Sequence, residues 1–339
     1  MAENTKIEWA HHTFNPWTGC TKIGPGCDHC YAESWAKRSG IVQWGPGAER
    51  RRTSEANWRQ PIKWNAEAER LGVRYRVFCA SLADVFDNKV PPEWRRDLFD
   101  LIAKTPNLDW LLVTKRIGNA KTMMADALHL NPTALSNGQI WPLPNVWLGI
   151  TVVNQAEADR DIPKLLAVPA RVRFLSIEPM LGPIDVRRFM WPVHPRWPAG
   201  FGSPEAAIAA GAKVTYHRQG LISAKWADHL LSWVICGGES GPGARPMHIP
   251  WARSLMQQCK AAGVAFHMKQ LGAQPRGWCV GQLHMEAEDR ADVEDDFCDG
   301  YEAHEFGRSC GRCVLLADRK GGDMAEWPED LRVREFPSA

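Results

Sequence analysis

Six short apolar runs recur along the chain, and each of them ends abruptly in polar residues. The runs cover residues 74–79, 108–113, 146–150, 172–177, 232–236 and 264–268. Nearly continuous apolar segments of this length, rich in β-branched and aromatic residues, are typical of strands buried on both faces of a parallel sheet. We therefore expect six parallel strands.

Amphipathic stretches separate several of these runs. Residues 91–105 begin with prolines and then place apolar residues at helical spacing, and residues 155–166 and 250–262 show similar patterns. Pro250 suits the first turn of a helix, and Gly263 suits the position just beyond a helix end. The alternation of strands and helices predicts an α/β fold, either a βα barrel or a doubly wound sheet.

Polar residues follow every expected strand. In parallel α/β folds the carboxyl ends of the strands meet at one edge, and that edge carries the functional site. We expect a shared active face there, although any one of these residues taken alone is equally well explained as an ordinary polar loop residue. The candidates for binding a cofactor are Ser81, Asp84, Thr114, Lys115, Thr151, Asn154, Glu178, Gly237, Gly238 and Glu239.

Two segments interrupt the strand–helix alternation. The first, at about 189–225, is rich in Pro, Gly and Ala and is interpreted as an insertion. The second, 273–316, holds an acidic run and four cysteines and is interpreted as a further insertion or a small subdomain. This leaves a barrel over 1–272 and a C-terminal tail, 317–339, that we expect to pack on the barrel and to contain a short strand at 331–336.

Charge is unevenly distributed along the chain. The formal net charge is +2, but residues 286–305 hold ten acids against one base, so the remainder carries +11. A basic body favours a polyanionic partner such as nucleic acid, and an ordinary solvated surface is the alternative. No apolar run approaches the ~20 residues of a membrane span. The polar N-terminus lacks the apolar core of an export signal, so we expect a cytoplasmic protein without a membrane partner.

A segment at 49–61 mixes arginines with a tryptophan. This is the composition of a surface that contacts phosphates and stacks on bases, and a solvated charged loop is the alternative. The candidate substrate-binding residues are Arg50, Arg51, Arg52, Trp58 and Arg59, together with Lys269 from the last expected strand.

The ten cysteines, in a chain without an export signal, point to metal or redox chemistry rather than to disulfides. We interpret Cys79, Cys236 and Cys259 as small buried hydrophobes, because they lie in apolar or helical contexts. A Cys-x2-Cys pair later in the chain favours a second metal site, either zinc or a second iron–sulfur cluster, with no metal as the alternative. Its four candidate ligands are Cys279, Cys298, Cys310 and Cys313.

Cys20, Cys27 and Cys30 form a different pattern, Cys-x6-Cys-x2-Cys, in a Gly/Pro loop that precedes a helical stretch at 31–38. Three thiolates from one loop are able to hold three irons of a cubane cluster and leave the fourth iron open to a ligand. A structural zinc ion would need a fourth closed ligand, for which nearby histidines are present, and unliganded thiols are the third alternative.

This cysteine loop resembles a variant of the radical S-adenosylmethionine (SAM) signature. The usual spacing in that superfamily is Cys-x3-Cys-x2-Cys with an aromatic residue before the last cysteine, whereas the first gap here is longer and His29 takes the aromatic position. The resemblance implies a partial (β/α) barrel, a [4Fe–4S] cluster and SAM bound to its open iron. It also implies an electron donor and cleavage of SAM to a 5′-deoxyadenosyl radical that abstracts hydrogen from a substrate.

More specifically, the chain resembles an uncharacterised phage-type family of three-cysteine-motif proteins. The resemblance spans most of 5–272 and implies a protein partner encoded nearby. In many radical SAM proteins a Gly-Gly-Glu element after an early strand binds the amino group of SAM. Gly237, Gly238 and Glu239 follow a late strand, so that role does not transfer, and Glu239 is left as an acceptor for an ammonium or a ribose hydroxyl. The matching segments are 15–20, 27–32, 81–86, 112–116, 177–180, 237–241 and 269–270.

The sequence thus predicts a radical SAM-like iron–sulfur enzyme that acts on nucleic acid or a nucleotide, with no catalytic side chain assigned. Two alternatives stay open. One is a non-catalytic, metal-stabilised nucleic-acid-binding protein, and the other is a radical SAM enzyme that acts on a protein or a small molecule.

Overall fold

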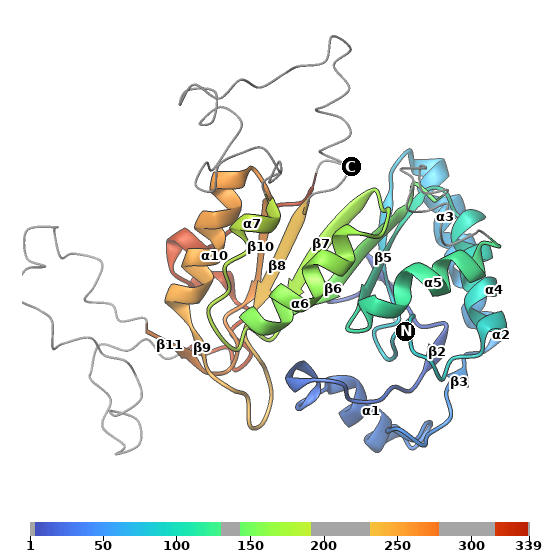
Figure 1. Ribbon diagram of the computed structural model, residues 1–339, viewed down its shortest axis with the longest axis horizontal. Coiled ribbons are helices and arrows are strands. Elements are labelled where there is room, and N and C mark those ends of the chain that lie inside the picture. The colour runs from blue at the N-terminus through green and yellow to red at the C-terminus, as the bar shows by residue number, and fades with distance from the viewer. Residues whose placement is uncertain (1–3, 130–142, 191–230, 278–315, 338–339) are drawn as a thin grey trace, which may run out of the picture.

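Seven parallel strands form one curled sheet in the computed structural model of the chain, which describes residues 4–129, 143–190, 231–277 and 316–337 (Figure 1). The strands lie across the sheet in chain order, so the α/β fold is an open half-barrel. The six strands expected from the apolar runs are confirmed, and a short seventh strand precedes them. In sheet order they are β1 (His12–Phe14), β4 (Tyr75–Cys79), β5 (Leu108–Thr114), β6 (Val146–Thr151), β7 (Val172–Ile177), β8 (Trp233–Gly237) and β10 (Ala265–Gln270).

Helices follow most of the strands and cover one face of the sheet (Figure 1). The expected helices are confirmed as α1 (Tyr31–Ser39), α4 (Pro92–Ala103), α6 (Gln155–Leu166) and α10 (Ile249–Ala262). Pro250 lies in the first turn of α10, and Gly263 caps its end in the left-handed conformation, as the sequence predicted. The elements that the sequence did not reveal are α2 (Glu55–Trp58), α3 (Gln60–Leu71), α5 (Ile117–Ala127), α7 (Arg187–Met190), and two small sheets of β2 (Trp17–Thr18) with β3 (Arg51–Arg52) and of β9 (Met247–His248) with β11 (Pro275–Arg276).

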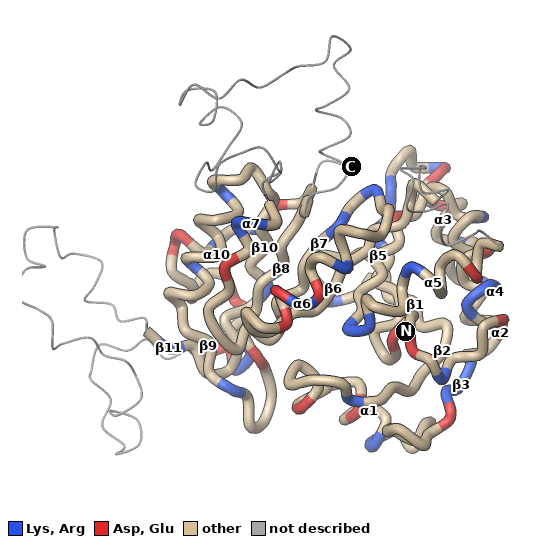
Figure 2. Tube along the Cα trace, in the orientation of Figure 1, with Lys and Arg blue, Asp and Glu red and all other residues tan. Residues whose placement is uncertain are grey.

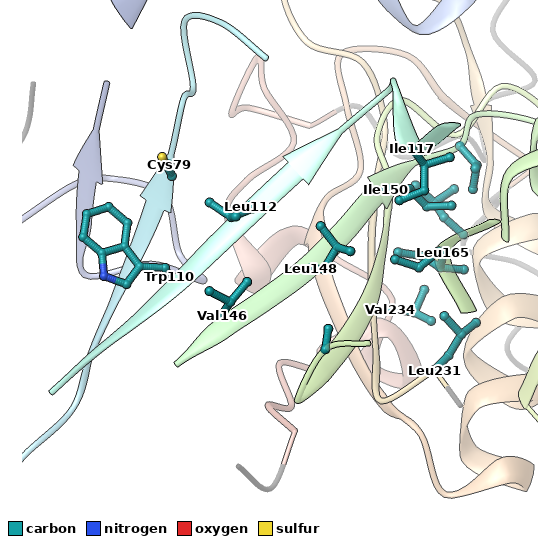
Figure 3. Packing of buried hydrophobic residues seen from close by; sticks show 14 of the residues in the cluster. Cys79, Trp110, Leu112, Ile117, Val146, Leu148, Ile150, Leu165, Leu231 and Val234 are labelled. Carbon is teal, nitrogen blue, oxygen red and sulfur yellow. The ribbon is translucent and has the colours of Figure 1, made fainter. Parts of the chain in front are cut away.

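Alternate residues of the strands enter two separate cores. Trp110, Leu112 and Leu148 point toward the helices and belong to the main core (Figure 3). Their chain neighbours Leu111 and Trp147 point the other way, into a second core on the face that the helices leave open, together with Trp9, Phe174, Trp233 and Ile235. A strand buried on both faces must be apolar at consecutive positions, and this accounts for the continuous apolar runs of the sequence.

The C-terminal residues 316–337 pack on the sheet beside β10. Trp327 and Leu331 are buried in the main core. The backbone N–H of Met268 donates to the carbonyl of Val333, and a single antiparallel bridge joins His267 to Arg334. The strand expected at 331–336 is therefore reduced to one bridge.

Several predictions fall on residues outside the described ranges. These are the insertion at about 189–225, except for its first two residues, the acidic run at 286–305 and the second cysteine set, Cys279, Cys298, Cys310 and Cys313. In the described part of the chain, no helix has the length and apolar character needed to cross a bilayer.

Candidate functional site

A cavity of about 600 Å³ opens at the carboxyl ends of the strands. All three cysteines of the early loop line it, and so do eight of the ten residues proposed from the strand ends. The eight are Ser81, Asp84, Thr114, Lys115, Thr151, Glu178, Gly238 and Glu239, and Lys269 lines the same space. Residues from six different strand ends thus converge, as expected when parallel strands end at one edge of a sheet.

The cysteine loop lies directly against this edge. It runs from β2 through a short 3₁₀ turn at Pro25–Cys27 to the start of α1 at Tyr31, and Cys30 is the N-cap residue of that helix. A Cβ atom added to Gly26 would lie 2.9 Å from a Val153 methyl and 3.3 Å from Cε of Lys115. The absence of a side chain at Gly26 therefore lets the loop backbone reach the ends of β5 and β6.

Arg116 joins the first cysteine to the barrel. Its Nη1 atom lies 3.3 Å from Sγ of Cys20 and 3.4 Å from Oδ2 of Asp84, and its Nη2 atom donates to the carbonyl of Thr21 at 2.8 Å. Burial raises the pKa of the Cys20 thiol to about 11, although the Arg116 guanidinium opposes that rise. A bound metal would add to the positive charge of Arg116 and favour the Cys20 thiolate further.

The three thiols have the donor chemistry for iron, and all three are half-buried, form no disulfide and line the cavity. Within residues 4–129, 143–190, 231–277 and 316–337, however, no three His, Cys, Asp or Glu side chains are grouped as the ligands of a metal ion would be. A cubane spreads three cysteine ligands over three irons, so its thiolates lie farther apart than the ligands of one ion. Three thiols in one loop are a donor set that either a cluster or a zinc ion accepts.

Asp84 organises the ends of two strands. Its carboxylate accepts hydrogen bonds from the Thr114 hydroxyl at 2.8 Å, from the Lys115 backbone at 3.1 Å and from the Phe86 backbone at 2.9 Å. The side chain is only 5% exposed. Because these donors and Arg116 occupy its oxygens, Asp84 fixes the shape of the wall rather than offering a free carboxylate.

Two lysines bring positive charge to the cavity. Lys269 forms an ion pair with Glu178 at 3.0 Å, whereas the ammonium of Lys115 contacts the Thr151 hydroxyl, 3.4 Å from its Nζ atom. A lysine whose charge meets no carboxylate among the described residues is suited to an anionic group of a ligand.

Glu239 is held by neighbours on both sides. Arg245 donates to both of its oxygens, at 2.7 Å and 3.0 Å, and Nδ1 of His29 lies 2.8 Å from Oε2. Burial by itself would raise the pKa of Glu239, but the hydrogen bonds from Arg245 and His29 lower it to about 2. The carboxylate is thus ionised and contacts the protein through both oxygens, while Glu239 also lines the cavity.

Two of the ten proposed residues do not line the cavity. Asn154 is the N-cap of α6, where its side chain accepts from the Glu157 backbone at 2.9 Å. Gly237 is the other. A Cβ on Gly238, which does line the cavity, would lie 2.2 Å from the carbonyl oxygen of Leu271, so the absence of a side chain allows close approach of the protein backbone. The two glycines let the ends of β8 and β10 touch.

The expected arginine surface does not form as a unit. Arg50 is 6% exposed and pairs with the buried Asp87 at 2.7 Å, so its placement on a phosphate-binding surface is wrong. Arg52 lies over the Trp58 ring at 4.1 Å and pairs with Asp97. Arg51 and Arg59 are exposed, and acidic as well as basic residues lie on these elements (Figure 2). None of Arg50, Arg51, Arg52, Trp58 or Arg59 lines the cavity.

Sequence reasoning missed three residues that tie the cysteine loop in place. Asn15 donates to the Ser81 hydroxyl at 3.0 Å, and the Tyr31 hydroxyl donates to the Ser81 carbonyl at 2.6 Å. Arg245 has no motif around it that would have drawn attention. Asn15 and Tyr31 lie in segments of the resemblance, which was the one signal for them in the sequence.

Comparison with known proteins gives one family. A family model described as "Protein of unknown function (DUF5131)" matches residues 4–306. No curated protein and no solved structure matches the chain. The matched range contains the cysteine loop and every cavity residue named above, but the family description names no activity.

Proposed function

The chain belongs to the DUF5131 family, whose function is unknown, and from the site itself we propose that it is a radical SAM-like iron–sulfur enzyme. One observation carries the proposal. Cys20, Cys27 and Cys30 share a cavity with eight strand-end residues that the sequence alone predicts to bind a cofactor. The strand ends meet because the sheet is parallel, but that topology does not require a three-cysteine loop from before the second strand to lie against them.

The thiolates of Cys20, Cys27 and Cys30 would hold a [4Fe–4S] cluster. When bound and reduced by an external electron donor, such a cluster supplies the one electron that splits SAM into methionine and a 5′-deoxyadenosyl radical. The protein's contribution is to hold the cluster and SAM and to exclude water. The glycines of the loop let its backbone lie against β5 and β6, and α1 presents its N-terminal turn at Cys30.

Lys115 is the residue best placed to bind the carboxylate of SAM. Its ammonium lies beside the Thr151 hydroxyl and faces the cavity without a carboxylate partner in the described chain.

The nucleic-acid part of the prediction has less support than the cofactor part. The arginines that suggested it pair with acids or lie away from the cavity. We retain a nucleotide or nucleic acid as the proposed substrate on the charge of +11 outside residues 286–305 alone.

Anaerobic reconstitution with iron and sulfide tests the proposal. The wild-type protein should bind about four irons, show a charge-transfer band in its visible spectrum and cleave SAM when reduced. Cys20→Ala, Cys27→Ala and Cys30→Ala should each lose cleavage, and the triple variant should lose iron. Cys79→Ala and Cys236→Ala are matched controls, because both thiols are buried in the main core. Full iron content in the triple variant would overturn the assignment.

A further inference from the structure

The cysteine loop and the loop after β8 are joined by a cluster of polar contacts that the proposed function does not use. Nη1 of Arg245 forms an ion pair with Asp28 at 3.1 Å, and its Nη2 donates to the Pro25 carbonyl at 3.0 Å. The same guanidinium holds both oxygens of Glu239, which also contacts His29. The residues that join the two loops through these polar contacts are 210 to 220 positions apart in the sequence.

The position of these polar contacts lets them restrain the cysteine loop. The cysteine loop leaves the sheet near β1, at one edge, while Glu239 and Arg245 follow β8, the sixth strand of seven. Cys27 and Cys30 flank the two loop residues that are held, Asp28 and His29. The loop is therefore fastened at both ends, by Arg116 near Cys20 and by Arg245 near Cys27.

We propose that Arg245 and Glu239 are positioning residues that fix Cys27 and Cys30 over the cavity as a preformed ligand pair. The inference rests on the proposed function in assigning these thiols to a cluster. Arg245 suits the task because its planar guanidinium bridges two carboxylates and a carbonyl at once, which a lysine ammonium cannot do in the same geometry. Its side chain is 26% exposed and that of Glu239 only 8%, so solvent screens the Glu239 contacts weakly.

Thiol labelling of the full-length, metal-free, reduced protein tests the restraint itself. Iodoacetamide modification is followed by mass spectrometry, with Cys20 as an internal reference because Arg116 holds it independently. In Arg245→Ala the labelling rate of Cys27 and Cys30 should rise about tenfold relative to that of Cys20. This factor corresponds to a loss of ~1.4 kcal/mol in the free energy that restrains the loop. Arg245→Lys should give an intermediate increase. Asp28→Asn, at a residue 53% exposed, removes the negative charge of one contact without threatening the fold and should give a small increase.

Arg253→Ala is the matched control. Arg253 pairs with Asp330 at 2.7 Å and has comparable exposure, but its partner is in the C-terminal tail. Equal Cys27 and Cys30 labelling in wild type, Arg245→Ala and Asp28→Asn would overturn the proposal, as would an equal increase in Arg253→Ala.

Cluster retention under a chelator provides the second measurement. After reconstitution, the Arg245→Ala and Glu239→Gln variants should lose iron about tenfold faster than wild type, and their visible spectra before the loss should match that of wild type. Rates of iron loss equal to that of wild type would overturn the assignment of a cluster-positioning role. If the wild type assembles no cluster, the proposed function fails, whereas the labelling result still shows whether Arg245 restrains the loop.

Discussion

Replacing Arg50 with alanine should destabilise the protein strongly, although the sequence suggested a surface residue. The guanidinium contacts Asp87 through Nε at 2.8 Å and Nη2 at 2.7 Å, and its other donors reach the Ala48 carbonyl and the Thr21 hydroxyl. Arg50 is 6% exposed and Asp87 is 3% exposed. Removal of one partner leaves an uncompensated buried charge, which costs about 3–5 kcal/mol.

Urea unfolding at pH 7, followed by tryptophan fluorescence, measures this loss. Arg96→Ala is the control, because Arg96 and Asp126 form an ion pair with both side chains at least 40% exposed, and such a pair contributes ~0–1 kcal/mol. The double variant Arg50→Met with Asp87→Leu should regain much of the stability, since neither charge is then buried alone.

The refuting result is equally definite. If Arg50→Ala lies within ~0.5 kcal/mol of wild type, the buried pair does not stabilise the fold in the way described. If, in addition, Arg50→Ala weakens nucleic-acid binding and reduces its salt dependence by about one phosphate contact, the surface interpretation suggested by the sequence is right.

Three further predictions address pH, packing and ligand binding. Burial, together with the positive charge of Arg334, lowers the pKa of His267 from 6.5 to about 4. Below pH 6.5 the unfolded chain therefore binds more protons than the folded protein. The free energy of unfolding should fall toward pH 4 by up to ~1.4 kcal/mol per pH unit from this residue. His267→Phe should flatten that dependence in denaturant titrations, and an unchanged slope would contradict the sign. Gly238→Ala should destabilise the protein by about 1–3 kcal/mol, because the new Cβ would lie 2.2 Å from the Leu271 oxygen. The control Gly118→Ala, in open space on α5, should instead stabilise the protein by about 0.5–1 kcal/mol. Equal effects of the two substitutions would refute the steric argument. Lys115→Met should weaken SAM binding to the reconstituted protein at least about tenfold in equilibrium dialysis, since a hydrogen bond to a charged group is worth ~1.5–3 kcal/mol, and unchanged affinity would remove Lys115 from the site.

The strand pattern was visible in the sequence because burial on both faces leaves a local record. Trp110, Leu111 and Leu112 must all be apolar when a helix layer covers one side and Trp9 with Phe174 covers the other. The polar residues at the strand ends were identifiable for a different reason, since parallel strands bring their carboxyl ends together in any such fold. The strand β1 was missed because its three residues, His12–Phe14, include only one apolar side chain.

The roles of individual charged residues were decided only by the tertiary structure. Arg50 and Arg51 are neighbours in the sequence, yet one is buried on Asp87 and the other is exposed with a backbone contact to Ile41. Glu239 is a strand-end carboxylate in the sequence, and only the fold shows that Arg245 and His29 contact its oxygens. Local sequence records which face of an element is buried, but the partner of a charge comes from wherever the fold brings another segment, here more than 200 residues away.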